Sequence, residues 1–207
     1  MVSGQVVYKT YAFVIATGFL CGPADTGACP AVARSVDGDS YEIGGAGTFD
    51  VQSKSAKAAG TFVHKSTNGN VVGTGVWTAT SLISFDSYGT QPAALMQRGM
   101  ATGSPQVGYR RKLPGSAALP TGGLAIFQIV LIPVSGIAET AVLQVNCALA
   151  NVPRERSVEG IRIKLDKNNS EYSEEAGARV VFLAQKLGAN EPSKVEERGD
   201  QSEEQQK

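Results

Sequence analysis

The segment G-T-F-V-H-K-S-T-N-G-N-V-V-G-T-G-V-W, residues 60–77, decides the fold class. Asn68-Gly69 lies between two stretches of β-branched and aromatic residues, and Asn-Gly is the dipeptide most typical of a two-residue β-hairpin turn. Counting outward from such a turn predicts the cross-strand pairs His64–Gly73, Phe62–Gly75 and Gly60–Trp77. Large rings would then lie over bare glycine backbone on the neighbouring strand, which fixes the register of the hairpin.

The segments around this hairpin also have the pattern of strands. From Ser40 to Gln52 the odd positions are apolar or glycine and most even positions are polar, as in a strand with one buried face. A glycine two residues before an aromatic recurs at 47–49, 60–62 and 75–77, a spacing that suits successive strands of a meander. Further strands are predicted at 11–20, 77–85, 124–134, 141–149, 159–165 and 178–184.

We therefore expect an all-β protein with about eight strands and no helix of three turns. Eight antiparallel strands can close into a single barrel, and the mid-strand glycines favour that closure. A two-sheet β-sandwich uses the same strands and is the alternative. The barrel or sandwich domain is predicted to cover residues 1–187, with a long loop at 90–123.

Residues 188–207 form the second predicted region. This segment holds six acidic and three basic residues, one β-branched residue and no aromatic residue. Such a segment buries too little apolar area to offset its ordering entropy, so we predict a disordered acidic C-terminal tail.

Composition excludes several classes of function. The 207 residues carry 19 Lys and Arg against 19 Asp and Glu, so no net charge attracts nucleic acid or an anionic membrane. No apolar run reaches the length of a membrane helix. One histidine and three cysteines are too few for a His-based metal centre or a dense disulfide scaffold. We expect no metal and no cofactor.

The N-terminal region raises the question of a signal peptide. Tyr11–Leu20 is apolar and Ala31-Val32-Ala33 matches a signal-peptidase site, but that site lies too far beyond the apolar run. Bulky residues at odd positions of the run indicate a strand instead. Low charge and abundant glycine favour an extracytoplasmic location, whereas the lack of a convincing signal argues against it, so the compartment stays open.

The two cysteines Cys21 and Cys29 enclose seven residues rich in turn formers. A disulfide between them is one interpretation, and two unpaired thiols are the other. Cys147 lies in an apolar strand, where cysteine commonly fills core space. The spacing of the three cysteines fits no zinc pattern.

His64 is the single histidine and the weak candidate for a catalytic residue. No G-x-S-x-G or similar nucleophile motif accompanies it, so no catalytic residue is assigned. If the face that carries Phe62, His64 and Trp77 lines a barrel lumen, these three residues are candidate ligand contacts. Tyr109, Arg110 and Arg111 in the long loop are candidates for holding an anionic group of the ligand.

Three segments resemble motifs of an uncharacterised group of bacterial β-rich proteins. They are Gly60-Thr61-Phe62-Val63-His64, Gly75-Val76-Trp77-Thr78-Ala79-Thr80 and Ser84-Phe85-Asp86-Ser87-Tyr88-Gly89, and the resemblance covers roughly residues 37–89. It implies a bacterial β-protein and attaches no activity.

The sequence supports three functional hypotheses. The first is a non-enzymatic β-domain that binds a small, mostly apolar ligand or serves a structural role. The second is a cofactor-free small-barrel enzyme, an isomerase, cyclase or hydrolase, that uses His64. The third is a subunit of a larger assembly, which requires an exposed apolar patch or a free strand edge. The oligomeric state is not predicted.

Overall fold

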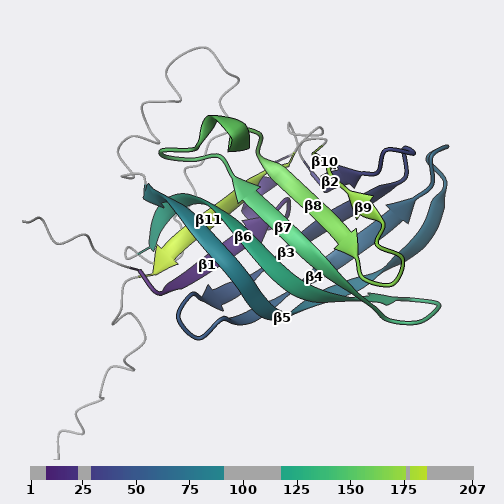
Figure 1. Cartoon of the computed structure of the whole chain (residues 1–207), viewed down its shortest axis with the longest axis horizontal. Helices are drawn as coiled ribbons and strands as arrows, with labels where there is room; N and C mark the ends of the chain where they lie inside the picture. The colour runs from purple at the N-terminus through teal and green to yellow at the C-terminus, as the bar shows by residue number, and fades with distance from the viewer. Residues whose placement is uncertain (1–7, 23–28, 91–117, 176–177, 186–207) are drawn as a thin grey trace, which may run out of the picture.

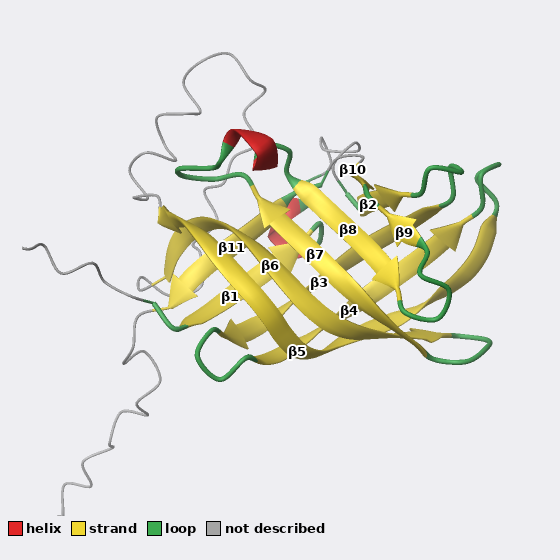
Figure 2. Ribbon diagram, viewed as in Figure 1, coloured by secondary structure: helices red, strands yellow, loops and turns green. Residues whose placement is uncertain are grey.

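A computed structural model describes residues 8–22, 29–90, 118–175 and 178–185 of the chain. Within these ranges eleven strands and two short 3-10 turns are present (Figures 1 and 2). The strands are β1 (Thr10–Ile15), β2 (Ala31–Arg34), β3 (Ser40–Asp50), β4 (Ser55–Lys65), β5 (Val71–Thr90), β6 (Ala118–Pro133), β7 (Glu139–Cys147), β8 (Gly160–Leu165), β9 (Glu171–Tyr172), β10 (Glu174–Glu175) and β11 (Val180–Gln185); the turns are η1 (Gly18–Leu20) and η3 (Arg154–Arg156). The prediction of an all-β protein is confirmed.

Strands β3 to β8 form an antiparallel meander in chain order, and the recurring glycine–aromatic pattern predicted its first three strands, β3 to β5. Strand β1 pairs with β3 and with β11, and β11 pairs with β6. These pairings close a ring of six strands in the order β1, β3, β4, β5, β6 and β11.

The remaining strands extend from this ring as two arms. Strand β3 pairs along one edge with β2 and then β1, while β6 pairs along one edge with β11 and then β7. The arm with β2 and the arm with β8 contact each other. The arrangement thus has a closed ring, as in a barrel, and two facing arms, as in a sandwich, and differs from a simple eight-stranded barrel.

The hairpin of β4 and β5 has the predicted core register. His64 pairs with Gly73, Phe62 with Gly75 and Gly60 with Trp77. The predicted two-residue turn is wrong, because Ser66 pairs with Asn70 and Thr67, Asn68 and Gly69 form a three-residue loop. A register shift next to His64 leaves Val72 as an extra residue, and this bulge restores the pairing that the shorter turn would have given.

The interior of the ring is filled by aromatic side chains. Phe13 stacks on Phe127 with ring centroids 4.9 Å apart, and Phe49 and Phe85 lie edge-on to Phe182. The alternating pattern of β3 holds: Tyr41, Ile43 and Phe49 are buried and face this interior. The dense packing makes this volume a side-chain core.

Several predicted boundaries are corrected by the structure. The predicted loop at 90–123 extends too far, because Ala118–Gly123 already belongs to β6. Strand β5 continues to Thr90 and contains three bulges that the sequence did not reveal. Strand β2 was not predicted, because three of its four residues, Ala31-Val32-Ala33, were interpreted only as a possible signal-peptidase site. The predicted tail, residues 188–207, lies outside the described residues.

Candidate functional site

Two rows of side chains cross the outer surface of β4, β5 and β6. Strand register aligns Thr61, Val76 and Ile132 in the first row. In the second row, Val63 pairs with Thr74, and the Val134 amide donates a hydrogen bond to the Thr74 carbonyl at 2.8 Å. The side chains of each row stand out from the sheet because they occupy alternate positions of their strands.

A shallow groove runs between the two rows. Its floor is the backbone of the intervening register row, Phe62, Gly75 and Pro133. The residues that line it are uncharged: Thr61, Phe62, Val63, Thr74, Gly75, Val76, Ile132, Pro133 and Val134. We call this surface the groove face.

Three of the nine large exposed apolar residues of the described chain, Val76, Ile132 and Val134, line the groove face, and three more, Val71, Val72 and Ile137, lie within three residues of its lining along the chain. Val134 and Ile137 are 84% and 87% exposed. The others are half-exposed and come from the start of β5 and the end of β6: Val71, Val72, Val76 and Ile132. Exposed apolar residues that gather around one groove usually mark a contact site, whereas apolar residues scattered singly do not.

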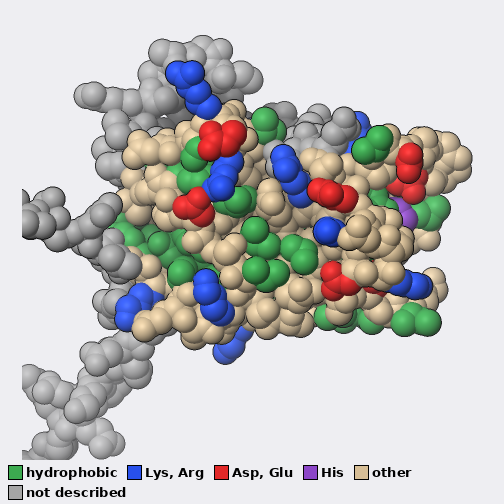
Figure 3. All heavy atoms as spheres, viewed as in Figure 1, with side chains coloured by type: hydrophobic (Ala, Val, Ile, Leu, Met, Phe, Trp, Pro, Cys, Tyr) green, Lys and Arg blue, Asp and Glu red, His purple; other side chains and the backbone are tan. Residues whose placement is uncertain are grey.

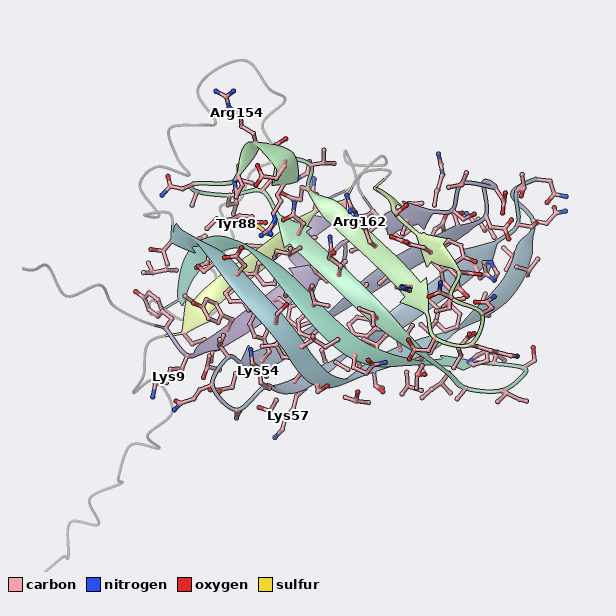
Figure 4. The ribbon with its side chains drawn as sticks, in the orientation of Figure 1. Lys9, Lys54, Lys57, Tyr88, Arg154 and Arg162 are labelled. Atoms are coloured by element: carbon pink, nitrogen blue, oxygen red, sulfur yellow. A yellow bond between two sulfur atoms is a disulfide. The ribbon has the colours of Figure 1, made fainter. Side chains whose placement is uncertain are left out.

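Charged groups at the border of the groove face neutralise each other. Lys65 follows Val63 on the same side of β4, and its ammonium forms an ion pair with the carboxylate of Glu42. By contrast, Lys9, Lys54 and Lys57 lie toward the other end of the molecule (Figure 4). Figure 3 shows acidic and basic side chains interspersed over the face turned to the viewer.

The predicted ligand contacts Phe62 and Trp77 lie on one face of the hairpin, as expected, but this face is turned into the core. Trp77 is fully buried and its indole N–H donates a hydrogen bond to the Gly44 carbonyl at 3.1 Å. The Phe62 side chain is also buried. A ligand could touch these two rings only after the interior had opened, so their role in binding stays a prediction.

The third predicted contact, His64, lies where the ring ends near the hairpin loops, and it is visible at the right of Figure 3. Its imidazole stacks on Tyr41 with centroids 4.5 Å apart, and Tyr172 lies edge-on to it at 6.1 Å. Its Nε2 is 3.8 Å from a carboxylate oxygen of Asp39. Within the described residues this nitrogen has no hydrogen-bond partner.

Burial lowers the pKa of His64, although the charges of Asp39 and Glu139 oppose this effect. The imidazole is therefore neutral at pH 7. Burial also raises the pKa values of Tyr41 and Tyr172, so both phenols stay protonated. A neutral imidazole can accept a proton, but Nε2 itself is buried although a quarter of the side chain is exposed, so a substrate could reach this nitrogen only after a local rearrangement.

A second polar cluster fastens η3 to the end of β5. The Tyr88 hydroxyl (Figure 4) donates to the side-chain oxygen of Asn146 at 2.8 Å, and the Asn146 amide donates to the Arg156 carbonyl at 2.7 Å. The guanidinium of Arg156 forms an ion pair with Asp86. These contacts satisfy the buried polar groups of the cluster, so we interpret it as structural.

The cysteines follow the first of the two interpretations. Cys21 and Cys29 form a disulfide, with Cα atoms 5.9 Å apart. Cys147 is a buried free thiol whose Sγ donates to the Val180 carbonyl at 3.2 Å, and burial raises its pKa. Among the described residues, no cluster of His, Cys, Asp and Glu is arranged to hold a metal ion. The candidates Tyr109, Arg110 and Arg111 lie outside the described residues.

Comparisons of the chain with protein-family models, with curated proteins and with solved structures found no match. The resemblance to a group of bacterial β-rich proteins therefore stays a prediction. No helix in the described part of the chain has the length and apolar character needed to span a membrane.

The sequence analysis did not predict the groove face, although the outward residues of the hairpin indicate it. Thr61, Val63, Thr74 and Val76 occupy the outward positions of the predicted hairpin, where polar side chains were expected. Val63 and Val76 on the outward face, with Phe62 and Trp77 on the inward face, indicate that both faces of the hairpin are covered, in the protein or in an assembly. The contribution of Ile132 and Val134 follows only from the pairing of β5 with β6.

Proposed function

We propose that this chain is a non-enzymatic structural β-domain that works as a subunit of a protein assembly and docks through the groove face. The observation that carries the proposal is the uncharged groove on β4, β5 and β6, which is lined by the strongly exposed Val134 and followed three residues along the chain by the equally exposed Ile137. Such a patch is costly to leave in water and is typical of contact surfaces.

The rigidity of the domain also supports a structural role. The strand pairing of the six-stranded ring is closed, and the aromatic interior of the ring is tightly packed around Phe127 and Phe182. A domain with a packed interior presents its outer surface in one fixed shape, which reduces the entropy lost when a partner docks.

A small apolar ligand in the same groove would be the competing use of this surface. The groove is open and shallow, whereas sites for small molecules usually enclose most of the ligand surface. A flat, open groove is better suited to a protein surface. An enzymatic role would instead depend on His64, which is on the inner side of β4 and away from the groove.

The experiment compares the size of the full-length protein in native cell extracts before and after substitution. The wild-type chain should elute from a sizing column above the 21.6 kDa of one chain. The double variant Val76→Asp/Val134→Asp should elute as the monomer, because docking would bury unpaired carboxylates. The variant His64→Ala should elute like the wild type. Monomeric elution of the wild type, or unchanged elution of the double variant, would contradict the proposal.

A further inference from the structure

We infer that the partner at the groove face is a second copy of this chain, bound in a symmetric dimer. This inference rests on the proposed function and specifies its partner. Closed two-fold dimers are the commonest assemblies of soluble chains, and their interface uses the same patch on both subunits. A patch can serve in this way only if it is complementary to itself in shape and in charge.

The shape of the groove face meets the first condition. The two rows of side chains, one through Val76 and one through Val134, are two residues apart along antiparallel strands, so they form parallel ridges about 7 Å apart. A second copy has ridges at the same spacing. Turned about a two-fold axis, each copy can place one ridge in the groove of the other, as packed sheets interdigitate.

The charge of the groove face meets the second condition. The lining residues are uncharged, and the bordering Lys65 and Glu42 are already paired within the chain. A self-contact therefore brings no like charges together. The formal net charge of the whole chain is zero, so long-range repulsion between copies is also small.

The exposed Val and Ile residues supply part of the apolar area that a dimer needs. The exposed fractions of six Val and Ile residues, three in the groove face and three within three residues of its lining along the chain, together equal almost four complete residues. At roughly 60–120 Å² for each buried Val or Ile side chain, they offer about 200–450 Å². A standard interface buries about 800 Å² on each partner, of which about 450–500 Å² is apolar. Thr61, Val63, Thr74 and Pro133 lie in the same surface and supply part of the remainder.

The test is sedimentation velocity of the purified full-length protein between about 1 and 100 µM. We expect the wild type to sediment as a dimer of twice 21.6 kDa in the upper part of this range. Val134→Asp should raise the dimer dissociation constant at least about tenfold, because the two-fold axis brings both new carboxylates into one interface. The Val134 side chain is strongly exposed, so the variant should keep the circular dichroism spectrum of the wild type.

The matched control is Val158→Asp, which adds the same charge at an exposed valine beside η3, away from the groove face. This variant should dimerise like the wild type. As a second measurement, Val134→Cys should form a covalent dimer under mild oxidation, whereas Val158→Cys should not, because position 158 lies outside the proposed interface. The native cysteines should not interfere, since Cys21 and Cys29 form a disulfide and Cys147 is buried.

Three results would overturn the inference: a monomeric wild type at 100 µM, a Val134→Asp variant that dimerises normally, or a small apolar molecule that co-purifies in the groove by native mass spectrometry. These failures are separable from failure of the proposed function. A purified monomer that still elutes in a large complex from extracts, in a way that depends on Val76 and Val134, would retain the assembly role and assign the groove face to a different protein.

Discussion

At the scale of single residues, the closest fit in the hairpin is that of Trp77 over Gly60. A Cβ atom at Gly60 would lie 2.6 Å from the indole nitrogen of Trp77 and closer still to the Gly44 carbonyl oxygen. Gly60→Ala should therefore lower the free energy of unfolding by about 1–3 kcal/mol or more, because the backbone of β3 must move. Urea denaturation measures the change.

Gly73→Ala is the matched control in the same hairpin. A Cβ atom there would meet the His64 Cβ at 3.8 Å, an ordinary contact. We expect a change within about 0.5 kcal/mol. Equal losses in the two variants would show that the nesting of Trp77 on Gly60 does not fix the register.

His64 provides a residue-scale prediction on pH. Its folded pKa lies below the ordinary value of 6.5, so the unfolded chain takes up the proton first as the pH falls. Stability that is present above pH 6.5 is then lost as the pH falls through the folded pKa.

Because this is the single histidine, a one-dimensional NMR titration reads its pKa directly. The value should be below 6.5, and Asp39→Asn should lower it further, since Asp39 favours the charged form. A value above 6.5, or an increase in the variant, would contradict the assignment of burial as the dominant effect.

At the scale of elements, the local sequence predicted the pairing of β4 with β5, whereas the exact loop and the bulges depend on details that it does not encode. The pair Phe62–Gly75 was predictable because ring and glycine must share a face. The loop at Asn68-Gly69 was not, since Asn-Gly also suits a three-residue loop followed by a bulge. In β5, two of the three bulges lie between Trp77 and Phe85 and allow Trp77, Leu82 and Phe85 to face the core despite their odd spacings. Such bulges follow from the curvature of the ring, which no short pattern contains.

The three-residue loop leads to a prediction at Gly69. Its φ is +81°, in the left-handed region, and a Cβ atom there would meet no atom within 4 Å. Gly69→Ala should therefore cost about 1–2 kcal/mol from backbone strain alone. Gly69→Asn should cost less, because asparagine tolerates this conformation. The two midpoints in urea would be compared, and equal stability of the alanine variant and the wild type would refute the left-handed turn.

At the scale of the whole molecule, the ring depends on contacts between the two ends of the described domain. Strand β1 lies between β3 and β11, so Tyr11 pairs with Ala184 across most of the sequence (Figure 1). The alternating pattern of β1 predicted a strand and a buried face, but a pattern has no information on distant partners. For the same reason the groove face, which needs β6 beside β5, could be recognised only after the strands were assembled.

The packed ring also allows a direct test of its interior. Trp77 is the single tryptophan and is fully buried, so its fluorescence reports on the core alone. Emission of the folded protein should be blue-shifted, and iodide should quench it several-fold less than in the urea-unfolded chain, because a charged quencher cannot enter a side-chain-filled interior. The groove variant Val134→Asp should keep both properties, since its side chain lies on the outer surface. Strong iodide quenching of the folded wild type would mean that water reaches Trp77. This result would contradict a filled interior and would favour the hypothesis that a ligand binds in the barrel lumen.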